Sequence, residues 1–135
     1  MIERHVDQLR KELGYDEPLT RQDDGSFFLE FEPGLNISVK ANMDGSGMLF
    51  CLLAPLPKEN REEFLKACMV GNLFGRETGG AALGVDASQT HLCLSLYLPE
   101  GIPYREFHDC FEDFLNYSDA WRREALVFAE VNGEA

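Results

Sequence analysis

Residues 71–86 of the chain read GNLFGRETGGAALGVD, and five of these sixteen residues are glycine. A phosphate-binding loop is the first interpretation to test, because such loops carry G-x-x-x-x-G-K-[ST] between a strand and a helix. Gly79 and Gly84 have the glycine spacing, but Val85 and Asp86 follow them. The stretch also lacks the G-x-G-x-x-G pattern of dinucleotide sites. The glycines therefore indicate architecture, namely a helix end, a tight passage with positive φ and the entry to a hairpin.

The segment before these glycines is predicted to be a helix over residues 58–74. Pro57 precedes it, acidic residues near its start suit the helix dipole, and Gly75 can end it. A helix that is apolar nearly all round must be buried nearly all round. A sheet can cover one face, but 135 residues leave little for the other, so we expect a second subunit there. The later turns of this helix carry the apolar residues Phe64, Leu65, Ala67, Cys68, Met69, Val70, Leu73 and Phe74.

Strands are predicted on both sides of this helix. After it, residues 79–86 and 91–99 form a hairpin in which four leucines alternate with other residues. Before it, residues 26–32 and 33–42 form a hairpin joined by a Pro-Gly turn. The run at 48–57 is apolar on both faces, which is typical of a central strand covered on both sides.

Two further helices complete the pattern. Apolar residues from Ile2 to Leu13 recur at spacings of four, three and four, and Gly14 can end this first helix. The last helix begins at Pro103 and either continues as one long helix or breaks near residues 116–119. The order α-β-β-β-α-β-β-α predicts an α+β fold with one twisted antiparallel sheet and three helices.

The length of the chain predicts one domain. A chain of 135 residues lies within the usual size of a single domain. We expect this domain to span residues 1–131 and residues 132–135 to form a frayed tail.

The charge of the chain limits its partners. Twenty-four acidic residues against 12 Lys and Arg give a net charge of −12, which repels nucleic-acid phosphates and anionic lipid headgroups. The start MIERHVDQLRKELG is charged from its third residue and resembles no signal peptide, and no run of about 18 apolar residues occurs. The sequence therefore predicts a cytoplasmic protein without nucleic-acid binding or membrane insertion.

Candidate metal ligands and catalytic groups are few. The four cysteines form no C-x-x-C pair, and isolated cysteines in apolar runs are usually buried. His91-x-Cys93 on a strand can ligate together, but His108-x-Cys110 on a helix points its two side chains roughly 200° apart. No nucleophile-elbow motif is present. We therefore expect no metal, no cofactor and no catalytic residues.

These features together resemble the class I chaperones of bacterial type III secretion, the Tir-chaperone type. The resemblance covers nearly the whole chain and lies in the order of elements, the acidic charge, the triplet Asn72-Leu73-Phe74, the pair Gly79-Gly80 and the leucine-rich hairpin that follows. It implies a small acidic homodimer without enzymatic activity. Such a dimer binds the N-terminal segment of a secreted effector in extended form and keeps it soluble and competent for export. Components of the secretion apparatus are further possible partners.

The resemblance and the apolar pattern together give two sets of candidate residues. For the dimer interface we predict contacts on the second helix, where a glycine allows close approach of two helices. For the effector we predict edge pairing of an extended segment with apolar contacts from the sheet and the first helix. The dimer set is Met69, Gly71, Leu73 and Phe74, and the effector set is Val6, Leu9, Phe28, Leu35, Ile37 and Val39.

Three alternatives stay open at the level of sequence. The same fold can act as a regulator that binds another regulatory protein. It can be a small ligand-binding domain or enzyme that uses the carboxylates of the last helix, Glu106, Asp109, Glu112 and Asp113, if a deep pocket encloses them. It can also be a structural subunit whose second helix faces an unlike partner.

Overall fold

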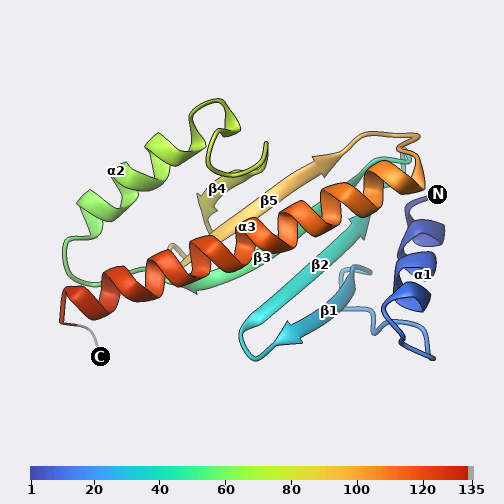
Figure 1. Ribbon diagram of the computed structural model, residues 1–135, viewed down its shortest axis with the longest axis horizontal. Coiled ribbons are helices and arrows are strands. Elements are labelled where there is room, and N and C mark those ends of the chain that lie inside the picture. Colours follow the sequence, from blue (N-terminus) through green and yellow to red (C-terminus); the bar gives the residue numbers. More distant parts are fainter. Residues whose placement is uncertain (134–135) are drawn as a thin grey trace.

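The computed structural model describes residues 1–133 as one antiparallel sheet with three helices (Figure 1). The strands lie in the order β1-β2-β3-β5-β4, so β3 is central as predicted. In Figure 1, α3 runs diagonally across one face of the sheet, while α1 and α2 lie near its opposite ends. The elements are α1 Ile2–Glu12, β1 Phe27–Glu32, β2 Leu35–Ala41, β3 Gly47–Pro55, α2 Arg61–Asn72, the 3-10 turn η1 Leu73–Gly75, β4 Ala82–Val85, β5 His91–Leu98 and α3 Tyr104–Val131.

The core lies between the sheet and α3. In β2 and β3 every second side chain points to α3, and the register pairs Ile37 with Cys51 and Val39 with Leu49. All four of these side chains are fully buried. Because a strand alternates its faces, the residues between them point to the other side of the sheet. The face of β2 that carries Leu35, Ile37 and Val39 therefore packs in the core.

Helix α3 is continuous over 28 residues, so the break considered near residues 116–119 does not occur. No glycine or proline interrupts it, and the small side chain of Ser118 is fully buried. Near its C-terminal half Arg122 holds the β1–β2 hairpin, donating to the Pro33 carbonyl oxygen at 3.0 Å. Its guanidinium also lies 3.4 Å from the Glu32 carboxylate.

Helix α2 is shorter than the predicted 58–74 at both ends. Asn60 has a left-handed φ of 53°, so the helix begins only at Arg61. At the other end α2 stops at Asn72, because Leu73 has a non-helical ψ of 115° and Phe74 has a left-handed φ of 58°. Gly75 and Gly79 have positive φ as predicted. A side chain on Gly75 would collide with the backbone of Gly80.

The C-terminal end is described only in part. Asn132 donates from its side chain to the Phe128 carbonyl oxygen at 2.8 Å and is hydrogen-bonded to Asn60. Residues 134–135 of the expected frayed tail lie outside the described residues. Among residues 1–133, no helix is both long and apolar enough to cross a bilayer.

Candidate functional site

Helix α2 has one buried face and one exposed apolar face. The buried face holds Phe64 and Cys68, and the Phe64 ring lies 5.1 Å from that of Phe128 on α3. Four apolar side chains at the end of α2 and in η1 point to solvent, and we call them the apolar corner. The corner consists of Met69, Val70, Leu73 and Phe74, which are 72%, 68%, 53% and 89% exposed.

The structure brings three of the four predicted dimer residues together in this corner. Gly71 lies on the other side of α2, where it is buried and where an added side chain would meet the Trp121 ring of α3. The close approach that this glycine allows is thus between α2 and α3 of one chain. Val70 was missed, although it belongs to the same apolar run and could have been included on that ground.

Phe74 is the most unusual residue of the corner. Its φ of 58° and ψ of 18° are left-handed, which costs a bulky L-residue roughly 1–2 kcal/mol. Its side chain is also almost completely exposed. Strained backbone and exposed aromatic side chains both concentrate at sites of interaction. The corner therefore has the properties of an uncovered contact surface.

The second candidate surface is the sheet face opposite α3, which we call the open face. It carries Phe28, Met48, Phe50, Leu52 and Tyr97, and the last three are 39%, 43% and 58% exposed. The register sets Met48 beside Tyr97 on the same face. A hollow of about 590 Å³ runs over this face, and polar groups from Gln22, Asn36, Ser38 and Lys40 border it.

The predicted effector residues divide between the core and this face. Leu35, Ile37 and Val39 are at most 4% exposed and point toward the core. Val6 and Leu9 are buried on α1, at 2% and 3% exposure. Phe28 alone lies half-buried at the open face. The exposed residues Phe50, Leu52 and Tyr97 were missed. Phe50 and Leu52 lie on β3, which is apolar on both faces and was expected to be covered on both sides, while Tyr97 lies on β5 on the face opposite its leucines.

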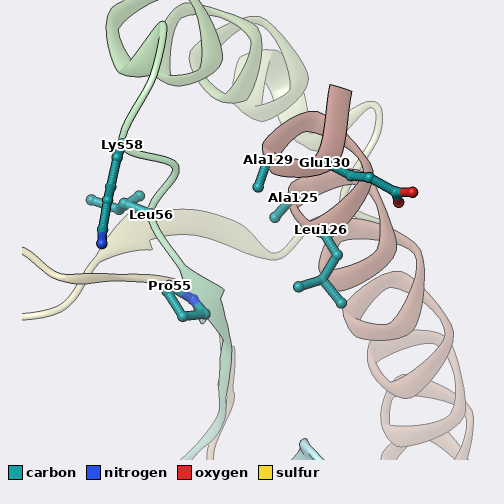
Figure 2. A pocket seen from close by; sticks show the side chains of 7 residues that line it. All are labelled: Pro55, Leu56, Lys58, Ala125, Leu126, Ala129 and Glu130. Carbon is teal, nitrogen blue, oxygen red and sulfur yellow. The ribbon is translucent and has the colours of Figure 1, made fainter. Parts of the chain in front are cut away.

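A second hollow, of about 650 Å³, lies between the end of β3 and the C-terminal turns of α3 (Figure 2). Its walls are mostly apolar, with Pro55 and Leu56 on one side and Ala125 and Leu126 on the other. The charged groups of Lys58 and Glu130 lie on opposite sides and do not converge (Figure 2). Small-molecule sites usually have convergent polar groups, so this hollow gives little support to a ligand site.

The four α3 carboxylates named above as candidates for acid–base chemistry lie in solvent. Glu106, Asp109, Glu112 and Asp113 are all exposed, and none of them lines the two hollows above. Within residues 1–133, no group of three His, Cys, Asp or Glu side chains is placed to hold a metal ion.

The raised pKa values of two cysteine thiols give no indication of a reactive cysteine among them. Burial raises the pKa of Cys68 to about 11, and it is the main cause that raises the pKa of Cys93 to about 11 as well. Both thiols are therefore protonated at neutral pH, whereas a nucleophilic cysteine needs a lowered pKa.

Sequence and structure comparisons both find proteins that resemble the chain over most of its length. A family model described as the Tir chaperone protein (CesT) family matches residues 4–122. The protein CPj0713/CpB0740 of Chlamydia pneumoniae is 30% identical over 122 residues, which cover 90% of this chain and 93% of that one.

Solved structures share the fold at low sequence identity. A chain of the ExsC–ExsE complex has a TM-score of 0.73 at 13% identity, and 92% of each chain is covered. A chain of the HopA1–SchA chaperone–effector complex has a TM-score of 0.68 at 16% identity, covering 90% of this chain and 93% of that one. The Yersinia pestis type III secretion chaperone SycH, in complex with a YscM2 fragment, gives 0.65 at 13% identity, covering 87% and 97%.

Proposed function

The chain belongs to the Tir chaperone protein (CesT) family, and from this membership we propose that it is a type III secretion chaperone. It binds the N-terminal segment of a secreted effector and keeps that segment soluble and competent for export. The observation that carries the proposal is the pair of exposed apolar surfaces, the corner and the open face, on a fold whose core is already filled. The protein acts by binding, without enzymatic activity, in the bacterial cytoplasm.

The apolar corner is the proposed contact between two copies of the chain. An isologous contact places the same patch of each copy against the other, so a single apolar patch is sufficient to form a dimer. Phe74 and Leu73, the exposed residues of η1, serve as the anchors. Gly71 supports the contact indirectly by allowing α2 to lie close to Trp121.

Leu73→Asp tests this contact. A charge buried in an apolar interface without a partner is strongly unfavourable, so the variant is expected to be a folded monomer. Sedimentation equilibrium gives the mass, and circular dichroism checks the fold. Met43→Asp is the matched control, because Met43 is fully exposed in the turn between β2 and β3. A Leu73→Asp dimer as tight as the wild type would show that the interface lies elsewhere.

The open face is the proposed contact for the effector. An extended segment can place apolar side chains against Phe28, Phe50 and Leu52 while its backbone pairs with an edge strand. The net charge of −12 favours effector segments with basic residues and speeds their approach. The buried residues of the predicted effector set, such as Ile37, act in this proposal only as the support of that face.

Co-expression tests the function directly. The chain is co-expressed with N-terminal segments of candidate effectors, and complexes are isolated through a tag on the chaperone. We expect two chaperone chains to one effector segment, with the segment protected from limited proteolysis only along the bound part. If no effector segment is retained, or if each retained segment is folded on its own, the proposal fails.

A further inference from the structure

Asn72, the last residue of α2, makes two hydrogen bonds to one residue of β4. Its side-chain amide nitrogen donates to the Leu83 carbonyl oxygen at 2.9 Å. Its side-chain oxygen accepts from the Leu83 backbone N–H at 2.6 Å. A residue of an adjacent antiparallel strand would likewise offer Leu83 one donor and one acceptor. The amide thus takes the place of a neighbouring strand.

Leu83 lies on an edge strand, so these two hydrogen bonds affect strand pairing. Strand β4 is an edge strand whose only neighbour is β5. In a four-residue strand the backbone groups alternate between the two sides, so Ala82 and Gly84 face β5 while Leu83 and Val85 face the open side. The backbone N–H and C=O of Leu83 point to this open side, and the Asn72 side chain is hydrogen-bonded to both. An incoming strand would have to displace Asn72 before it could form a ladder.

The backbone on both sides of Asn72 is in contact with Trp121 of α3. The helix that carries it is fixed to α3 at Gly71, against which the Trp121 ring packs. The Trp121 indole N–H also donates to the Glu77 carbonyl oxygen at 2.8 Å, which fixes the loop after η1. Contacts with α3 thus fix the chain before and after Asn72, which limits the positions that its side chain can reach.

The other edge of the sheet is covered over only part of its length. Residues Thr20 to Gln22 pair with the start of β1, since Phe28 N–H donates to the Thr20 oxygen and Gln22 N–H to the Ser26 oxygen. By alternation the next outward residue of β1 is Glu30, which lies beyond this short pairing. The two edges thus differ, because β4 is closed at its centre and β1 is open around Glu30.

We propose that Asn72 closes the β4 edge to strand addition, by an effector segment or by a second copy of the chain. Strand pairing is thereby directed away from β4 and toward β1. The consequence for the effector rests on the proposed function, whereas closure of β4 is a property of the chain itself. Exposed edge strands promote edge-to-edge association, so the same contact also protects the chaperone from aggregation.

Hydrogen exchange and sedimentation of Asn72→Ala test the closure without any effector. The loss of a hydrogen bond is expected to speed exchange of the Leu83 amide about tenfold. The Gly84 amide faces β5 and serves as the internal control. Sedimentation velocity should show assemblies larger than those of the wild type, growing with concentration. Asn60→Asp, at the exposed start of the same helix, should change neither result.

Asn72→Asp adds a pH test that a merely structural role would not give. The ionised carboxylate still accepts from the Leu83 N–H but cannot donate to the Leu83 carbonyl oxygen, so at pH 8 that oxygen is open to an incoming strand and larger assemblies form. The protonated acid both donates and accepts as the amide does. Closure is therefore regained as the pH falls through the pKa of this carboxyl group, and sedimentation velocity across pH measures it.

Two results would overturn the closure. One is an unchanged Leu83 amide in Asn72→Ala, and the other is a Leu83 amide that exchanges faster in Asn72→Ala without larger assemblies. If Asn72→Ala does not fold, the size of the Asn72→Asp assemblies at high and low pH decides whether this side chain closes the edge. The mass of the wild type tests the proposed dimer separately, because a monomeric wild type would remove the dimer and leave the comparison of Leu83 exchange intact.

Discussion

Phe74 combines strain and exposure, and the two have opposite consequences. Asn adopts left-handed φ readily, so Phe74→Asn should relieve strain and stabilise a single chain by about 1 kcal/mol. The same substitution removes the largest exposed ring of the apolar corner, so it should weaken the dimer. Urea unfolding in a monomeric Leu73→Asp background measures the first effect, and sedimentation of Phe74→Asn alone measures the second. Stability and association that fall together would contradict this account.

Gly71 is a second residue whose substitution tests the packing. An Ala in a helix normally gains up to about 1 kcal/mol over Gly. Here the added carbon would lie 2.6 Å from a ring atom of Trp121, and overpacking of this kind costs about 1–3 kcal/mol. Gly71→Ala should therefore lower the free energy of unfolding despite the better helix former. The single Trp121 provides the fluorescence signal.

Gly84→Ala is the control for this substitution. A side chain at Gly84 would meet no atom within 4 Å, and the backbone there does not need positive φ. It should unfold at nearly the wild-type urea concentration. Equal urea midpoints for Gly71→Ala and Gly84→Ala would mean that α2 can move away from α3 without loss.

At the scale of elements, the turn of the β4–β5 hairpin depends on one carboxylate. Asp86 accepts from the backbone N–H groups of Thr90 and His91 and from the Ser88 hydroxyl. These bonds favour the ionised form and lower its pKa to about 2, with the bond from His91 as the largest cause.

The sign of the pH effect follows from that lowered pKa. The folded pKa lies below the unfolded one, so the stabilisation is present above about pH 4 and is lost as the pH falls toward 2. Asp86→Ala should therefore unfold at lower urea than the wild type at pH 6, and the difference should vanish near pH 2. A difference that stays constant over this range would show that the carboxylate charge does not matter.

The sequence predicts the order of elements well, because alternation and helical spacing are local properties. The ends of α2 were predicted less well, since the periodicity of apolar residues does not show that Asn60 and Phe74 adopt left-handed φ. Which face of each strand is buried was the hardest feature to predict from the sequence. Strand β3 is apolar on both sides, and only the packing of α3 decides that Leu49 is buried while Phe50 is exposed. The sequence therefore named three residues of the apolar corner but only one residue of the open face, Phe28.

At the scale of the whole molecule, one layer of helix and one layer of sheet leave two apolar surfaces uncovered. The corner lies at the α2 end of the sheet and the open face lies opposite α3. Because the two surfaces are formed by different elements, binding of a second copy and binding of an effector can be separated by mutation. The proposed function therefore predicts variants that lose effector binding and keep the dimer.

Neighbouring positions of β3 provide the test of that separation. Phe50→Asp places a charge on the open face, where water can solvate it, so the fold and the dimer should persist while the effector segment is lost. Leu49→Asp places the same charge in the core and should cost several kcal/mol, enough to unfold the chain. Circular dichroism, sedimentation and co-purification of the effector segment report the three properties. A Phe50→Asp chaperone that retains its effector segment would show that the open face is not the binding surface, and the edge strands alone would then have to account for binding.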